Sequence, residues 1–98
     1  MHDVRVDPER HEIDLLLEMA PALRGASVLE VGCGDGRLTR LYSPLAARVL
    51  AVDPSANRIE RARARQAEVP GVEFRQAAIA DLAPASGEFD LGILAWSL

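Results

Sequence analysis

Three glycines at every second position, Gly32, Gly34 and Gly36, constrain the fold of this chain more than any other feature. They directly follow the apolar run at 28–31, and apolar residues at helical spacing come after them. Glycine lets a backbone turn sharply and lie close to a ligand, because no side chain stands in the way. A buried strand, a glycine loop and a helix in this order are typical of the first crossover of a nucleotide-binding α/β sheet.

The rest of the chain alternates between helix-like and strand-like segments. Apolar spacing and turn residues predict a first helix that begins after Asp7 and stops near 21–25, and further helices at about 36–42 and 56–68. They also predict buried strands at about 27–31, 48–52, 72–75 and 89–96. Parallel strands need crossover connections, which are right-handed and usually helical. The alternation therefore predicts one domain, residues 1–98, with a Rossmann-like α/β fold: a three-layer sandwich of a parallel sheet with helices on both faces.

The charge balance and the single cysteine exclude several classes of partner and site. Eleven basic residues, all arginine, are outnumbered by fifteen acidic residues, so the net charge is -4. We therefore expect neither nucleic acid nor an anionic membrane as a partner. Cys33 is the only cysteine, which excludes an internal disulfide and a zinc site built from thiols, and we expect no metal. No apolar stretch has the length of a signal-peptide core or a membrane span, so we expect a cytoplasmic protein.

Two acidic residues beside the glycine loop indicate the charge of the ligand. Glu30 precedes the loop, where a carboxylate at the mouth would repel a diphosphate and suit an ammonium or a sulfonium. Asp53 ends the second strand, where it could accept hydrogen bonds from the vicinal hydroxyls of a ribose. An ordinary turn and helix-cap role of Asp53, followed by Pro54 and Ser55, is the alternative. A dinucleotide fingerprint fits less well, because Arg37 stands where its last small residue belongs.

Taken together, these residues resemble a class I S-adenosylmethionine-dependent methyltransferase of the small-molecule type. The resemblance is carried by four motifs in the family's order and spacing, at 28–36, 49–55, 72–82 and 89–96. It implies S-adenosyl-L-methionine as the cofactor and a small-molecule methyl acceptor. The resemblance also implies that the loop backbone lies against the methionine part of the cofactor, and that Glu30 favours its cationic groups. The implied cofactor-binding residues in these motifs are Glu30, Gly32, Cys33, Gly34, Asp53, Pro54, Ala78, Ile79, Asp81 and Ala95.

The resemblance assigns the adenine to the loop after the third strand. Ala78 occupies the position of the acid that usually accepts from the adenine amino group, which leaves the Ile79 N–H and a displaced Asp81 as partners. At the end of the fourth strand, the carbonyl of Ala95 would face the amino group of the cofactor, and Trp96 would flank the reactive methyl. No residue is identified as a catalytic base.

In the complete fold of this family further strands follow the fourth, whereas this chain ends at Leu98. We therefore expect the chain to be the cofactor-binding half of the enzyme, truncated after the fourth strand. The fourth strand is then an open edge through which another copy or a partner chain would pair. Two other functions remain open: a non-catalytic interaction or regulatory module that keeps the half-fold, and a nicotinamide-binding oxidoreductase domain, which Glu30 and the glycine spacing disfavour.

Overall fold

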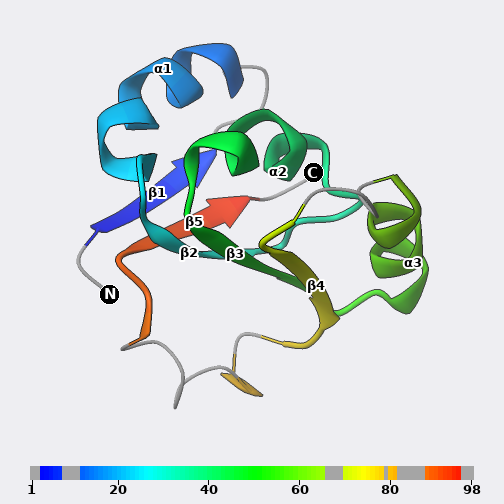
Figure 1. Ribbon diagram of the computed structural model, residues 1–98. Helices are drawn as coiled ribbons and strands as arrows, with labels where there is room; N and C mark the ends of the chain where they lie inside the picture. The colour runs from blue at the N-terminus through cyan, green and yellow to red at the C-terminus, as the bar shows by residue number, and fades with distance from the viewer. Residues whose placement is uncertain (1–2, 8–11, 66–69, 79, 82–87, 96–98) are drawn as a thin grey trace.

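Five parallel strands form one sheet in the order β1-β5-β2-β3-β4 (Figure 1). The computed structural model describes residues 3–7, 12–65, 70–78, 80–81 and 88–95. The strands are β1 (Asp3–Asp7), β2 (Ser27–Val31), β3 (Arg48–Asp53), β4 (Val72–Gln76) and β5 (Leu91–Ala95). The helices are α1 (Glu12–Leu23), α2 (Arg37–Tyr42), the short 3-10 helix η1 (Ser43–Leu45) and α3 (Ala56–Arg65). The four predicted strands and the parallel α/β fold are confirmed.

The predicted end of the first helix is confirmed. The sequence predicts a stop near 21–25, and α1 ends at Leu23, with Pro21 inside its last turn. Met19 and Leu23 flank the proline and are fully buried, so their packing outweighs the backbone hydrogen bond that proline cannot donate. Gly25, with φ of 71°, then turns the chain into β2. The prediction that α3 extends over 66–68 falls outside the described residues.

Residues 3–7 form a fifth strand, β1, which we did not predict from the sequence. β1 pairs in parallel with β5, with Asp3 opposite Leu91 and Asp7 opposite Ala95. Because β2 pairs with the other side of β5, the predicted open edge at the fourth strand is wrong. The edge strands of the sheet are β1 and β4. Alternation of valine with charged residues over 3–7, DVRVD, is the pattern of an edge strand, and our prediction from the sequence did not use it.

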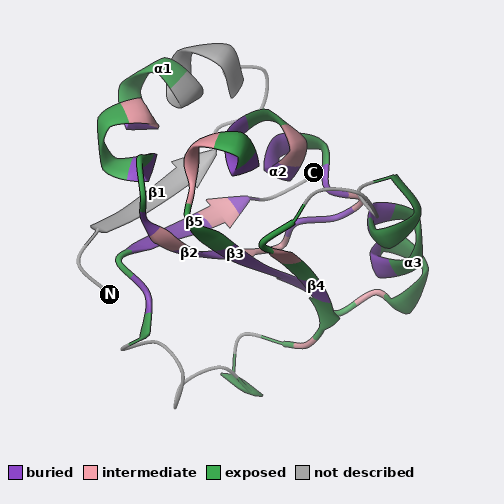
Figure 2. Ribbon diagram, in the orientation of Figure 1, coloured by how far each residue is buried: buried purple, intermediate pink, exposed green. Residues whose placement is uncertain are grey.

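The helices of the described residues pack on one face of the sheet. That face joins Val28, Ala51 and Ile93 of the strands to buried side chains of α1, α2 and α3. Figure 2 shows buried segments on the strands and on all three helices. The opposite face carries a separate apolar cluster that includes Leu29 and Phe89 and contains no described helix residue. The predicted second helical layer is therefore not found in the part of the chain that the structure describes.

Crossover handedness explains this one-sided arrangement. The chain steps across the sheet in one direction from β2 to β3 to β4, and β1 and β2 follow the same direction. Right-handed crossovers in one direction put every connecting helix on the same face. The return from β4 to β5 runs the other way, so a right-handed connection there belongs on the opposite face. Its described segments lie on the side of the sheet away from the helices (Figure 1). Its described residues contain no α-helix, so side chains such as Ala77 and Phe89 cover that face instead.

Candidate functional site

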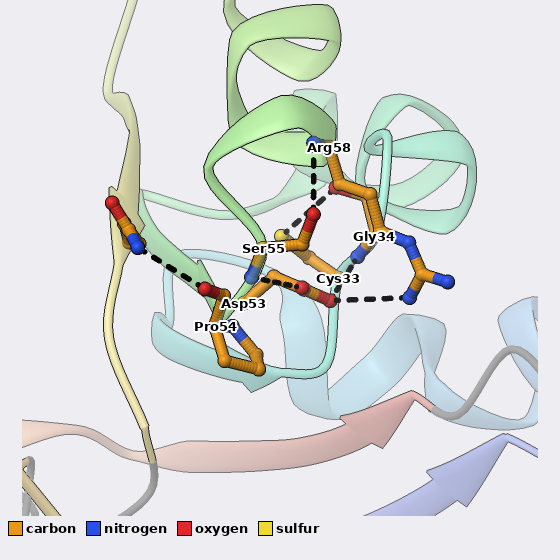
Figure 3. A network of polar contacts seen from close by, with 7 residues as sticks. Cys33, Gly34, Asp53, Pro54, Ser55 and Arg58 are labelled. Carbon is orange, nitrogen blue, oxygen red and sulfur yellow. Dashed lines mark hydrogen bonds and ion pairs between the residues drawn. The ribbon is translucent and has the colours of Figure 1, made fainter.

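The glycine loop and Asp53 meet at the carboxyl edge of the sheet. β2 and β3 pair in parallel with Val31 opposite Val52, so the two strands end side by side. The carbonyl of Val52 then accepts hydrogen bonds from the amides of Gly32 and Cys33, at 2.8 Å and 3.0 Å. One residue further along each segment, the amide of Gly34 donates to Oδ2 of Asp53 at 3.0 Å (Figure 3). The predicted proximity of the loop and this acid is confirmed.

The carboxylate of Asp53 is buried, at 3% exposure, and holds two turns at once. Its Oδ2 accepts from Gly34, while its Oδ1 accepts from the amide of Ser55 at 2.9 Å. The hydroxyl of Ser55 in turn accepts from the amide of Arg58 at 3.3 Å, which caps α3 as the sequence predicts. An ionised carboxylate has about four lone-pair positions. The turn role of Asp53 is therefore compatible with further hydrogen bonds from ligand hydroxyls.

Glycine is needed at positions 32 and 34 of the loop for different structural reasons. A Cβ on Gly32, whose φ is 80°, would collide with the carbonyl oxygen of Ala95 at the end of β5. Gly32 therefore allows β2 and β5 to end close together. Gly34 has φ of 58°, and a Cβ placed there would meet nothing within 4 Å. The backbone at Gly34 thus borders open space, beside the carboxylate of Asp53.

Gly36 packs instead against the neighbouring helix and strand. A Cβ there would lie 3.1 Å from the ring of Phe74 on β4 and 3.3 Å from the Cβ of Ala62 on α3. The glycine pattern in the sequence does not distinguish the three positions. The structure separates them, because among the three only Gly34 borders open space.

Glu30 lies beneath helix α2 and not at the mouth of the loop, which corrects the predicted position. It is fully buried, and its Oε1 accepts from the hydroxyls of Thr39 and Tyr42, each at 2.6 Å. Alternation along β2 explains this placement, since Glu30 shares the helix-covered face with Val28. Thr39 and Tyr42 were not predicted from the sequence. Their spacing of three residues on one helix face was the available signal.

The two buried acids shape the electrostatics around Cys33. Burial raises the pKa of the Cys33 thiol far above its ordinary value, and the charges of Glu30 and Asp53 raise it further. The fold therefore favours the neutral thiol of Cys33, which argues against a nucleophilic role. Burial likewise raises the pKa of Tyr42, with the Glu30 charge as the next cause. Tyr42 thus keeps its proton and donates a hydrogen bond to Glu30.

The loop after β4 is tied to the same edge of the sheet. The amide of Ala77 donates to the carbonyl of Asp53 at 3.1 Å, and the Gln76 side chain donates to the carbonyl of Pro54 at 3.2 Å. Oδ2 of Asp81 accepts from the amide of Ala78 at 3.2 Å. The displaced acid therefore reaches back to the position that the resemblance assigned to an adenine-binding acid.

Some predicted positions cannot be placed. Ile79 and Trp96 lie outside the described residues. Among the described residues, no three His, Cys, Asp or Glu side chains gather as they would around a metal ion. In the same part of the chain, no helix has the length and apolar character needed to cross a membrane.

Comparison with known proteins identifies the family. Residues 28–98 match the methyltransferase domain family. The malonyl-[acyl-carrier protein] O-methyltransferase of Enterobacter lignolyticus is 37% identical over 83 residues, which are 85% of this chain and 32% of that protein. A ubiquinone biosynthesis O-methyltransferase of Methylocella silvestris is 40% identical over 70 residues, 69% of this chain and 27% of that protein.

A solved structure agrees with the sequence matches. The crystal structure of a putative S-adenosylmethionine-dependent methyltransferase from Listeria monocytogenes superposes with a TM-score of 0.73 and 28% identity, over 89% of this chain and 39% of that chain. The chain spans about a third of the length of the curated relatives it matches. The motifs, the parallel sheet and these matches agree: the chain belongs to the class I S-adenosylmethionine-dependent methyltransferases.

Proposed function

We propose that the carboxyl edge of β2 and β3 binds S-adenosyl-L-methionine and that the protein serves methyl transfer to a small-molecule acceptor. The observation that carries this proposal is the contact between Gly34 and Asp53, beside open space at the loop. A buried carboxylate next to exposed loop backbone suits a ligand that carries both vicinal hydroxyls and positive charge. The solved structure of the Listeria methyltransferase, named for the same cofactor, supports this choice.

Each residue would hold a different part of the cofactor. Asp53 would accept from the ribose hydroxyls, and the backbone of Gly32, Cys33 and Gly34 would lie against the methionine part. Glu30 would act through its field from beneath the loop, since its carboxylate is covered by α2.

The nucleoside and the methionine ammonium would use the neighbouring loops. The adenine would lie by Pro54, Ala78 and Ile79, with Asp81 close to the amide of Ala78. The carbonyl of Ala95, beside Gly32, would accept from the amino group of the cofactor.

The chain contributes positioning rather than acid or base chemistry. The bound cofactor supplies an already activated methyl group on its sulfonium. The glycine loop and Asp53 would hold the nucleoside so that the acceptor meets the methyl in line, and proximity of this kind supplies most of the rate. We name no catalytic base among the described residues.

The relatives support the acceptor class. Their names refer to malonyl-[acyl-carrier protein] and to ubiquinone biosynthesis, and both proteins are O-methyltransferases. For this chain we propose the class of small organic acceptors and do not name a single acceptor. A cytoplasmic location is part of the proposal, since the one cysteine is a buried free thiol, which suits a reducing compartment.

Isothermal titration calorimetry with three ligands tests the cofactor. S-adenosyl-L-methionine and its demethylated product should each bind at one site and compete with each other. NAD should neither bind nor displace them. Saturable binding of NAD, or an absence of heat with both methionine nucleosides, would overturn the proposal. An assay for methylated product with the protein expressed from the full-length gene then distinguishes an enzyme from a non-catalytic module.

A further inference from the structure

Arginines concentrate in one third of this acidic chain. Residues 35–65 hold seven arginines and three acidic residues, whereas the other residues hold four arginines and twelve acidic residues. Three of these arginines, Arg37 of α2 and Arg58 and Arg61 of α3, line one pocket of about 250 Å³. The net negative charge of the chain therefore conceals a cationic region next to the glycine loop.

The pocket lies between the start of α2, at Arg37, and residues 58–61 of α3. Its remaining lining residues are Gly34 and Asp35. Figure 3 shows Arg58 reaching from α3 toward Gly34 and Asp53. The pocket thus adjoins the proposed cofactor site, and it is built largely from side chains that this site does not use.

Three arginines and one acid, Asp35, line the pocket. Asp35 already forms a 2.7 Å ion pair with Arg65, on the last turn of α3. Asp53 is 3.9 Å from Nη1 of Arg58, beyond hydrogen-bond length, and it is committed to Gly34 and Ser55. Guanidinium groups that line one small pocket repel one another, and an anion between them would relieve that repulsion.

We propose that this pocket is an anion site that takes a phosphate group. Guanidinium groups present fixed forks of N–H donors, which match the oxygen geometry of phosphate and bind it through two parallel hydrogen bonds. Arg58 and Arg61 lie one turn apart on the ten-residue helix α3, so both guanidinium groups can reach one ligand. Arg37 completes the site from the other helix.

The pocket would communicate with the cofactor through Arg58, and this step rests on the proposed function. Arg58 both lines the pocket and forms an ion pair with Asp53. A phosphate that draws Arg58 away would leave Asp53 free for ribose hydroxyls and would add negative charge near a cationic ligand. Phosphate should therefore strengthen S-adenosyl-L-methionine binding, and the cofactor should strengthen phosphate binding by the same factor.

The experiment titrates inorganic phosphate into the protein by calorimetry without cofactor, at constant ionic strength set with chloride. Phosphate should saturate one site. Arg61→Gln should lower the affinity for phosphate about tenfold, because one charge-assisted contact is lost. The matched control is Arg24→Gln, which removes an exposed arginine beyond α1, away from the pocket. It should change the affinity less than twofold, and far-ultraviolet circular dichroism checks that both variants fold.

Two results would overturn the site: no saturation by phosphate, or equal weakening in Arg61→Gln and Arg24→Gln. A short phosphomonoester, titrated in the same way, shows whether the site takes phosphate bound to an organic group or free phosphate alone. Because these titrations contain no cofactor, their outcome is separate from that of the proposed function. A second series with S-adenosyl-L-methionine present then measures the coupling, which should disappear in Arg58→Gln.

Discussion

The amide of Gly34 and the carboxylate of Asp53 are joined by a 3.0 Å hydrogen bond between two segments nineteen residues apart. This bond fixes the glycine loop to the end of β3, so the two proposed halves of the cofactor site are held together by the protein itself. Since the carboxylate also holds the amide of Ser55, the site is organised by a single buried acid.

Replacing that acid, Asp53, should therefore weaken binding of the cofactor. Asp53→Asn keeps one acceptor oxygen for the turn but removes the charge and the second acceptor. We expect the affinity for S-adenosyl-L-methionine, measured by calorimetry, to fall about 10- to 100-fold, the cost of losing charged hydrogen bonds.

Asp90→Asn is the matched control. Asp90 also accepts a backbone amide, that of Ser27 at 3.0 Å, but at the amino end of β2 and away from the loop. Its replacement should leave the affinity unchanged. Equal affinities in Asp53→Asn and the wild-type protein would show that the ribose does not use this acid.

The two loop glycines should respond differently to alanine. Gly32→Ala combines a positive φ with a collision at the Ala95 carbonyl, so we expect a loss of about 3 kcal/mol in unfolding free energy. Gly34→Ala bears only the backbone cost, about 1 kcal/mol. Its methyl would occupy the open space beside Asp53, so cofactor affinity should fall more than stability. Urea denaturation and calorimetry measure the two quantities, and equal destabilisation by both changes would contradict this assignment.

How far the sequence predicts this site depends on which contacts are local. The glycine loop and Asp53 are predictable, because an apolar strand followed by glycine or by Asp-Pro-Ser marks a strand end, and parallel strand ends share one edge. Glu30 adjoins the loop in sequence, yet alternation along β2 turns it under α2. The residues next to Glu30 in sequence do not predict its burial, because burial depends on which face of β2 is covered by α2.

Other features depend on contacts across the fold. The parallel pairing of β1 with β5 joins segments almost ninety residues apart, so no local pattern could reveal it. The pocket lined by Arg37, Arg58 and Arg61 exists because α2 and α3 pack on the same face of the sheet. Overall charge, from which we expected neither nucleic acid nor an anionic membrane as a partner, averages over this kind of local concentration.

The buried hydrogen bond between Tyr42 and Glu30 should stabilise the fold. Tyr42→Phe removes one of the two hydroxyls that donate to Oε1, both in a fully buried position. We expect the unfolding free energy to fall by about 1–3 kcal/mol, the cost of removing a buried partner from a charged group. Leu41→Ala, at a 41% exposed position of the same helix, is the control and should cost less. A Tyr42→Phe protein as stable as the wild type in urea would show that this bond contributes nothing.

Stability should fall at alkaline pH through Cys33 and then Tyr42. The fold raises the pKa of both groups, so the unfolded chain loses their protons first, near the ordinary values of 9.0 and 10.0. Stability from each group is complete below its ordinary value and declines above it, by about 1.4 kcal/mol per pH unit. Cys33→Ala should remove the decline that begins near pH 9, and Tyr42→Phe the later one. An alkaline profile that stays unchanged in both variants would show that neither group causes the decline.

Deleting residues 1–7 should expose the edge of β5. With β1 gone, the backbone groups that pair from Leu91 to Ala95 would have no partner strand, and an apolar strand with an open edge is a template for association. We expect the shortened protein to self-associate with rising concentration, as seen by light scattering, while the full chain changes less. A shortened protein that scatters as a monomer at every concentration would show that β1 does not protect this edge. Replacing residues 3–7 by an equally long glycine-serine segment is the control for chain length, and it should behave like the deletion because it lacks the valines of the strand pattern.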